Sequence, residues 1–282
     1  MRKWTRRARV VECDESSQKA IGKTRGVQRS AVRPSPVFLG ILAVTVAGGV
    51  IAAIWSPLAG GGRDPLGTLG VFLLVIGGWV ASLTLHEFGH ALVAFKGGDY
   101  SVAHKGYLTM DVRKYTDPVL SILLPLVFLA IGGIPLPGGA VWINRGALRS
   151  RATSTWVSLA GPLSNLAIGV AISLIVSLVT MPAGLLIGLS YLALLQIVTF
   201  ILNILPVPGL DGYGAIEPYL SPQARELGAK ARPWAPLILF ACLFALPGAS
   251  ALLWNAAFAL FNAVGGSGYA AQVGQYVVMF WR

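Results

Sequence analysis

The strongest constraint on the fold is an apolar run from Gly67 to Phe95, which is long enough to cross a bilayer as one helix. The ionisable residues in this run are His86, Glu87 and His90. Ionisable groups are costly at membrane depth, and packing gives no reason to place them there. The run therefore predicts a membrane helix whose polar residues serve a function.

Further apolar runs extend this interpretation to the rest of the chain. Of its 282 residues, 55% are hydrophobic and 12% are charged, and the mean hydropathy is +0.70. Soluble domains carry about 25% charged residues. The sequence predicts an all-α polytopic membrane protein with about six transmembrane helices, at Ser35–Trp55, Gly67–Phe95, Ser154–Thr180, Ala183–Leu205, Pro233–Leu246 and Ala249–Val264.

The basic residues indicate topology rather than nucleic-acid binding. The net charge is +11, but many of the lysines and arginines lie in residues 1–34 and most others in short loops. Such loops face the cytoplasm under the positive-inside rule. We expect residues 1–34 to be a disordered cytoplasmic tail and residues 35–282 to be one integral domain in a prokaryotic plasma membrane. Cys13 and Cys242 provide no disulfide framework.

Three connecting segments carry their own expectations. The stretch from Asp99 to Val112 is rich in β-forming residues and predicts a hairpin. Residues 118–137 are apolar but interrupted by prolines and glycines, so we expect them to enter the membrane and return on the same side. The following stretch, Gly139 to Asn144, is expected to form a short strand. Its residues Gly139, Val141 and Ile143 are candidates for contact with a substrate.

His86-Glu87-Phe88-Gly89-His90 has the spacing of a zinc site. Histidines four residues apart lie on one face of a helix and can bind one metal ion, and Glu87 can act as general base on a water at that metal. The motif could occur by chance in a soluble helix, but a membrane span makes that reading weaker. A third histidine, His104, lies in a loop, where we expect it to be solvated.

Asp211 follows a break in the apolar pattern from Asn203 to Gly212, which contains two prolines and two glycines. Such a break is tolerated at membrane depth where protein or a water-filled cavity surrounds it. One interpretation makes Asp211 a turn or capping residue just outside the bilayer. The other makes it the third zinc ligand, which would leave one coordination position for water.

Three blocks of the sequence together resemble the site-2 protease family of intramembrane zinc metalloproteases. His86-Glu87-Phe88-Gly89-His90 matches the H-E-x-x-H of that family. Gly161-Pro162-Leu163-Ser164-Asn165 is similar to its glycine-proline block, and the segment from Asn203 to Gly212 is similar to its block ending in aspartate and glycine. The resemblance covers residues 67–215, and Gly209 departs from it, since many members have proline there.

The resemblance implies one zinc ion bound by His86, His90 and Asp211, with Glu87 as base and with Asn165 and Asn203 lining the site. It also implies cleavage of single-pass membrane proteins within or near their transmembrane segments. With a cytoplasmic N-terminus, the motif at the far end of the second span is expected near the cytoplasmic side. The chain leaves no room for a PDZ domain, so we expect a compact member without an appended regulatory domain. The substrate and the oligomeric state stay open.

Two other classes of function remain open from the residues alone. One is a zinc-binding scaffold or chaperone that does not cleave, although the intact Glu87 argues against it. The other is a metal-ion transporter, which often shows two related halves with broken helices in matching positions. The sequence shows no convincing internal repeat of that kind.

Overall fold

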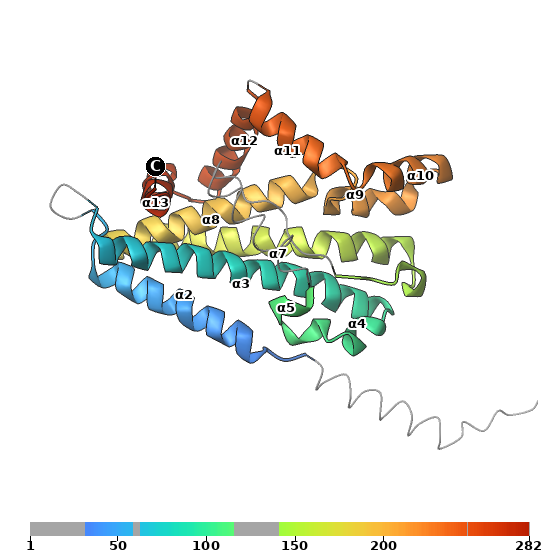
Figure 1. Cartoon of the computed structure of the whole chain (residues 1–282), viewed down its shortest axis with the longest axis horizontal. Coiled ribbons are helices and arrows are strands. Elements are labelled where there is room, and N and C mark those ends of the chain that lie inside the picture. The colour runs from blue at the N-terminus through green and yellow to red at the C-terminus, as the bar shows by residue number, and fades with distance from the viewer. Residues whose placement is uncertain (1–31, 59–62, 116–140, 247, 282) are drawn as a thin grey trace, which may run out of the picture.

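The structure, a computed structural model, describes residues 32–58, 63–115, 141–246 and 248–281. These residues contain helices and connecting segments and no β-strand (Figure 1). In chain order the elements are α2 (Pro36–Ile54), α3 (Pro65–Gly97), α4 (Ser101–His104), η1 (Tyr107–Thr109), α5 (Val112–Tyr115), η3 (Arg145–Ala147), α7 (Arg151–Leu178), α8 (Ala183–Ile204), α9 (Asp211–Ile216), η4 (Glu217–Tyr219), α10 (Pro222–Ala231), α11 (Ala235–Ala245), α12 (Ala249–Ala263) and α13 (Gly268–Val278).

Four helices are long and apolar enough to cross a membrane: α2, α3, α7 and α8. They coincide with the four clear runs of the sequence, so the prediction of an all-α membrane protein is confirmed at that level. Helix α3 has 33 residues and therefore extends for about 50 Å. Because a hydrocarbon core is about 30 Å thick, α3 is longer than one crossing requires.

The expectation of six transmembrane helices is wrong. Helices α11 and α12 have 11 and 15 residues, or about 16 and 22 Å, and neither crosses a bilayer by itself. Helices α10 and α11 could form one broken span, bent by 62°, which gives at most five spans among the described residues. The two apolar runs instead form a helical pair that packs on α8 through Phe240, Leu243 and Phe261.

The expected hairpin in Asp99–Val112 is also wrong, because this segment forms α4, η1 and the start of α5. Asp99 accepts hydrogen bonds from the backbone N–H and the hydroxyl of Ser101, at 3.0 and 2.6 Å, which favours a helical turn. Gly106 and Met110 then adopt left-handed conformations, with φ of 75° and 48°. These two bends leave no run of extended backbone long enough to pair.

The β-forming residues of this segment are explained by burial against α3. Val102, Tyr107, Leu108 and Tyr115 form one hydrophobic cluster with residues of α3 such as Ala91. Branched and aromatic side chains suit any half-buried surface, so their enrichment does not by itself specify a strand.

Several other expectations fall wholly or partly outside the described residues. These are residues 1–31 of the expected tail at residues 1–34, the expected re-entrant segment at residues 118–137, and Gly139. The end of the expected strand, Val141 to Asn144, is described. It belongs to no helix and pairs with no strand in the described ranges, so the strand as expected is not found.

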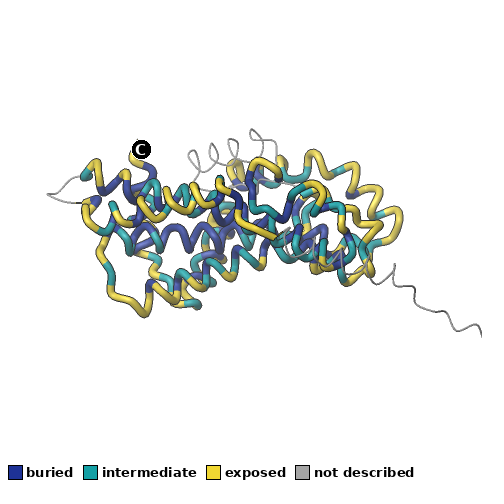
Figure 2. Tube along the Cα trace, turned by 90° about the horizontal axis from the view of Figure 1, so that it is seen from below, coloured by how far each residue is buried: buried dark blue, intermediate teal, exposed yellow. Residues whose placement is uncertain are grey.

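The core of the bundle lies where α3 and α8 meet. Figure 2 shows buried residues running along the interior of the long helices, with exposed residues on the outer faces. Val71 and Val75 of α3 and Tyr191 and Leu195 of α8 are fully buried in one cluster, which α13 completes with Val277. Helix α7 packs on both α3 and α8.

Helices α3 and α7 approach closely beside the H-E-x-x-H motif. A Cβ atom on Gly89 of α3 would lie 3.1 Å from the carbonyl oxygen of Ala160 in α7, which is tighter than an ordinary contact. The next residue of α7 is Gly161. Glycine on both helices thus brings their backbones together at the place where the histidines lie.

The C-terminal helix is fixed to the opposite end of α3. The guanidinium of Arg63 donates hydrogen bonds to the carbonyl oxygens of Phe280 and Tyr276, at 2.8 and 3.2 Å, and lies 3.9 Å above the Tyr276 ring. A cation at the carbonyl end of a helix is favourable because the free carbonyls there carry partial negative charge. The sequence alone had indicated no role for this region.

Candidate metal centre

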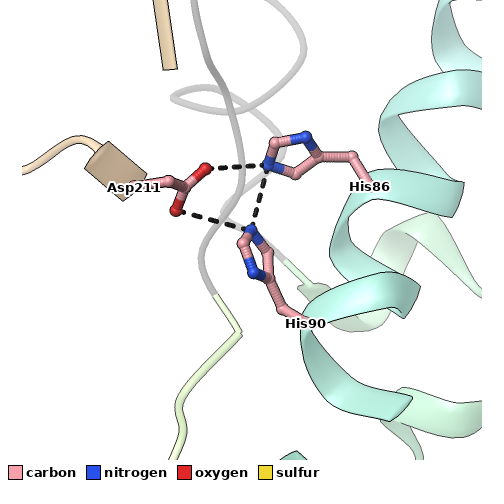
Figure 3. Close-up of side chains that lie close together, drawn as sticks. All are labelled: His86, His90 and Asp211. Carbon is pink, nitrogen blue, oxygen red and sulfur yellow. Dashed lines mark hydrogen bonds and ion pairs between the residues drawn. The ribbon is translucent and has the colours of Figure 1, made fainter. Parts of the chain in front are cut away.

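Three side chains from two distant parts of the chain meet at one point (Figure 3). His86 and His90 lie one turn apart on the same face of α3, and Asp211 is the first residue of α9. The Nε2 atoms of His86 and His90 are 3.1 Å apart. The Asp211 carboxylate places Oδ2 3.2 Å from the first and Oδ1 3.4 Å from the second.

The break after α8 delivers Asp211 to this point. Helix α8 ends at Ile204, and Leu210 N–H then donates to the carbonyl of Val207 at 2.9 Å in a tight turn. Gly209 adopts φ of +101°, in the region that favours glycine. Because proline is restricted to φ near −65°, the residue that many family members have there would not fit this turn.

Gly212 allows the chain to return close to the end of α8. A Cβ atom on Gly212 would collide with the backbone carbonyl of Ile204. Packing therefore requires glycine at the position after Asp211, and this close contact holds the start of α9 against the end of α8.

Hydrogen bonds fix the tautomer of both histidines. Nδ1 of His86 lies 2.5 Å from Oδ1 of Asn165, and Nδ1 of His90 lies 2.6 Å from the carbonyl oxygen of Val157. Both oxygens can only accept, so both Nδ1 atoms carry the proton and donate. Both Nε2 atoms then direct lone pairs toward Asp211, as a pair of metal-binding histidines requires.

Gln196 of α8 orients Asn165 and was missed by the sequence analysis. The amide nitrogen of Asn165 donates to Oε1 of Gln196 at 2.7 Å, so the amide oxygen of Asn165 faces His86. Both residues are buried. The available signal was an amide in the middle of an otherwise apolar span, where a polar group usually bonds to another helix.

The geometry fits a tetrahedral metal ion. Zinc binds histidine nitrogen and carboxylate oxygen at about 2.0–2.1 Å, which puts neighbouring ligand atoms of a tetrahedron about 3.3 Å apart. The three separations of 3.1, 3.2 and 3.4 Å agree with that spacing. Two imidazoles and a carboxylate are also a donor set that zinc uses.

Gly161 keeps the space in front of the histidines free of side-chain atoms. A Cβ atom on Gly161 would lie 2.5 Å from Nε2 of His86 and closer still to Nε2 of His90. Any larger residue at this position would occupy the face of the imidazoles where a metal ion would bind.

The charge of Asp211 also suits a metal site. Burial raises the pKa of the Asp211 carboxyl, but the adjacent imidazoles of His90 and His86, in their charged form, outweigh burial and lower that pKa. The residue is held as a carboxylate, the form that binds a cation.

Glu87 lies beside His86 and is buried, with 3% of its surface exposed. Its carboxylate accepts the backbone N–H of Val141 at 3.2 Å. A segment distant in sequence therefore holds the carboxylate of Glu87 next to the three-residue cluster.

The remaining candidates occupy different places. Asn203 is buried in the last turn of α8, and its amide nitrogen has no hydrogen-bond partner among the described residues. Val141 and Ile143 are partly buried against the cluster around α3, and His104 is exposed. Gly139 lies outside the described residues.

The chain has relatives among curated proteins. A protein of Mycobacterium tuberculosis is 44% identical over 256 residues, which make up 90% of this chain and 96% of that protein. One from Mycolicibacterium smegmatis is 42% identical over 255 residues, with the same coverage of both chains. One from Bacillus subtilis is 35% identical over 185 residues, 62% of this chain and 81% of its own length.

All three carry the name "Putative zinc metalloprotease", followed by Rip2 for the first two and by YwhC for the Bacillus protein. No family model matches the sequence. No solved structure matches the chain.

Replacing Gly161 by alanine should remove most of the zinc, because the added Cβ would occupy the space in front of both Nε2 atoms. Elemental analysis of purified protein, at equal helical content by circular dichroism, checks this. Gly40→Ala is the control, since a Cβ on Gly40 meets nothing within 4 Å. Wild-type zinc content in Gly161→Ala would contradict the placement of the metal.

Proposed function

The chain belongs to the site-2 protease family of zinc metalloproteases, and from this premise we propose that it hydrolyses a peptide bond within or beside the transmembrane segment of a single-pass membrane protein. The observation that carries the proposal is the meeting of Asp211 with His86 and His90 of the long apolar helix α3, which also carries Glu87. A scaffold or a metal-ion transporter would not require a general base at that position.

The depth of the site supports a membrane substrate. His86 lies 21 positions after Pro65, which places it about 32 Å along α3. A hydrocarbon core is about 30 Å thick, so the site lies near one boundary of the membrane rather than at its centre. A peptide bond near the end of a substrate helix would reach this depth.

In the proposed reaction His86, His90 and Asp211 hold the zinc ion. When bound, zinc polarises the scissile carbonyl and makes a water molecule more acidic. Glu87 takes the proton of the attacking water and transfers it to the leaving amine. The Val141 N–H holds the Glu87 carboxylate in place for both transfers, and the hydrogen bonds that His86 and His90 donate to Asn165 and Val157 keep the imidazoles from rotating.

Replacing Glu87 by glutamine should lower cleavage by about 10²- to 10⁴-fold while zinc content stays unchanged, because an amide cannot accept the proton. The measurement is turnover of a single-span reporter, labelled with a fluorophore and reconstituted with the purified protein in liposomes. A His86→Ala, His90→Ala variant should lose both zinc and cleavage. Wild-type turnover in Glu87→Gln would refute the proposed mechanism.

The segment from Val141 to Asn144 is the proposed holder of the substrate backbone. Val141 and Ile143 pack inward and Trp142 and Asn144 are exposed, which is the alternation of a strand. An unwound substrate could pair with such an extended segment through backbone hydrogen bonds, which give affinity without strict sequence preference.

Existing hydrogen bonds indicate which edge of this segment would face the substrate. The Trp142 carbonyl accepts from Lys105 at 2.9 Å, and the Asn144 N–H donates to Asp99 at 2.7 Å. In extended backbone, alternate residues direct their polar groups to the same edge. Trp142 and Asn144 thus use one edge, and Val141 and Ile143 use the other, on which Val141 N–H meets Glu87.

A proline at Ile143 should impair cleavage without loss of zinc, because it removes a donor on the edge proposed to pair with the substrate. We expect KM for the reporter to rise on the order of tenfold. Trp142→Pro is the matched control, since its N–H belongs to the other edge. A proline at Val141 would be a poorer test, because it would remove the donor to Glu87. Equal effects of the two prolines at 143 and 142 would refute the pairing.

We place the active site near the cytoplasmic side, with the N-terminus also cytoplasmic. Figure 1 shows α4, the start of α7, α9 and α10 at one end of the bundle and the end of α2 and the start of α3 at the other. The first end carries Lys96, Lys105, Arg113, Lys114, Arg145, Arg149, Arg151, Arg225, Lys230 and Arg232, and the second carries Arg63. Short loops rich in lysine and arginine stay in the cytoplasm.

Cysteine labelling in intact cells tests this topology. In a Cys13→Ser, Cys242→Ser background, a cysteine at Leu58 should react with a membrane-impermeant maleimide from outside, and a cysteine at Ala147 should react after the cells are opened. Both positions are exposed on the protein surface. Labelling of position 147 in intact cells would reverse the proposed orientation.

A further inference from the structure

Glu217 binds two arginines that come from different parts of the chain. It is the first residue of η4, and its side chain is 15% exposed. Its Oε2 lies 2.5 Å from Nη1 of Arg145. Nη2 of Arg232 lies 3.1 Å from Oε1 and 3.2 Å from Oε2.

Each partner belongs to an element that the proposed reaction uses or borders. Arg145 directly follows the Val141–Asn144 segment, and Arg232 lies where the chain bends by 62° between α10 and α11. Glu217 itself directly follows α9, which begins with Asp211. One carboxylate therefore connects the proposed substrate-pairing segment, the helix that starts with Asp211, and the bend at α11.

The other attachments of the pairing segment are on the side of α3 and α4. Its ends are bound to Glu87 and Asp99, and Lys105 holds its middle. On the other side, the Arg145–Glu217 bridge is the ion pair that links the end of this segment to η4, directly after α9, among the described residues. Gly214 makes room for it, because a Cβ there would lie 3.2 Å from Nη2 of Arg145.

This bridge differs from an ordinary surface ion pair. The Lys230–Glu226 pair in α10 joins two side chains that are 71% and 68% exposed, and pairs of that kind contribute little. Glu217 is mostly buried and serves two guanidinium groups. Without its charge, the like charges of Arg145 and Arg232, whose side chains are 45% and 50% exposed, would repel each other, which favours their separation.

We propose that Glu217 is a positioning residue, whose bridges to Arg145 and Arg232 hold the substrate-pairing segment at a fixed distance from the helix that carries Asp211. The inference rests on the proposed function for its kinetic consequence. It predicts that loss of the Glu217 charge weakens the hold on the substrate and leaves the zinc site intact, because Asp211 lies at the other end of α9.

The first test measures the position directly and does not depend on cleavage. Spin labels on cysteines at Ala147 and Gln223, in the Cys13→Ser, Cys242→Ser background, report the distance between η3 and α10. Glu217→Gln should lengthen and broaden the distance distribution. Glu226→Gln, which breaks the exposed Lys230 pair, is the matched control and should leave it unchanged. An unchanged distribution in Glu217→Gln would overturn the proposal.

The second test measures the consequence for the reaction with the liposome reporter. Glu217→Gln should raise KM on the order of tenfold with zinc content unchanged. Exchanging the charges, as Arg145→Glu with Glu217→Arg, should restore most of the affinity that Glu217→Arg alone loses. Loss of zinc in Glu217→Gln, or failure of the exchange to restore KM, would mean that Glu217 only stabilises the fold.

The two tests separate this inference from the proposed function. A wild-type protein that does not cleave the reporter would count against the proposed function, whereas the distance measurement would still decide the role of Glu217. A normal KM in Glu217→Gln with active wild type would count against the inference alone.

Discussion

The approach of the two imidazoles of α3 to the carboxylate of Asp211 is the interaction on which the arrangement of the long helices depends. It joins residues 86 and 90 to residue 211, so the segment that follows α8 must return to α3 about two thirds of the way along that helix. The supporting hydrogen bonds extend the same constraint to α7 through Asn165 and Val157, and to α8 through Gln196. Three membrane helices are therefore held in register by polar contacts, where apolar packing alone could let them slide.

The sequence predicted those parts of the fold that depend on local patterns. Four apolar runs predicted the four long helices. The spacing of His86 and His90 predicted that both side chains lie on one face of α3, and this face meets Asp211. It failed where tertiary contacts decide the local structure. The residues from Asp99 to Val112 look like strands because they are branched and aromatic, yet their burial against α3 is compatible with helical turns.

Contacts between distant residues explain most of what the sequence analysis could not supply. Gln196 is one amide in an apolar helix, and its role becomes visible when Asn165 lies beside it. Glu217 is an acidic residue directly after the short helix α9, and its partners Arg145 and Arg232 lie 72 and 15 positions away. The runs predicted for α11 and α12, Pro233–Leu246 and Ala249–Val264, are shorter than the roughly 20 residues that one crossing needs, so their apolar composition did not by itself make them spans.

The length of α3 has a consequence for hydration. His86 lies about 32 Å from the start of α3, so the membrane placement proposed above would put the cluster where the hydrocarbon gives way to the headgroups. In that placement a water molecule would reach the cluster from the adjacent aqueous phase without a channel through half the bilayer. A helix that unwinds there exposes its backbone to a partly wet layer, where water satisfies the freed N–H and carbonyl groups, so the energetic barrier to presenting a peptide bond is lower than at the bilayer centre.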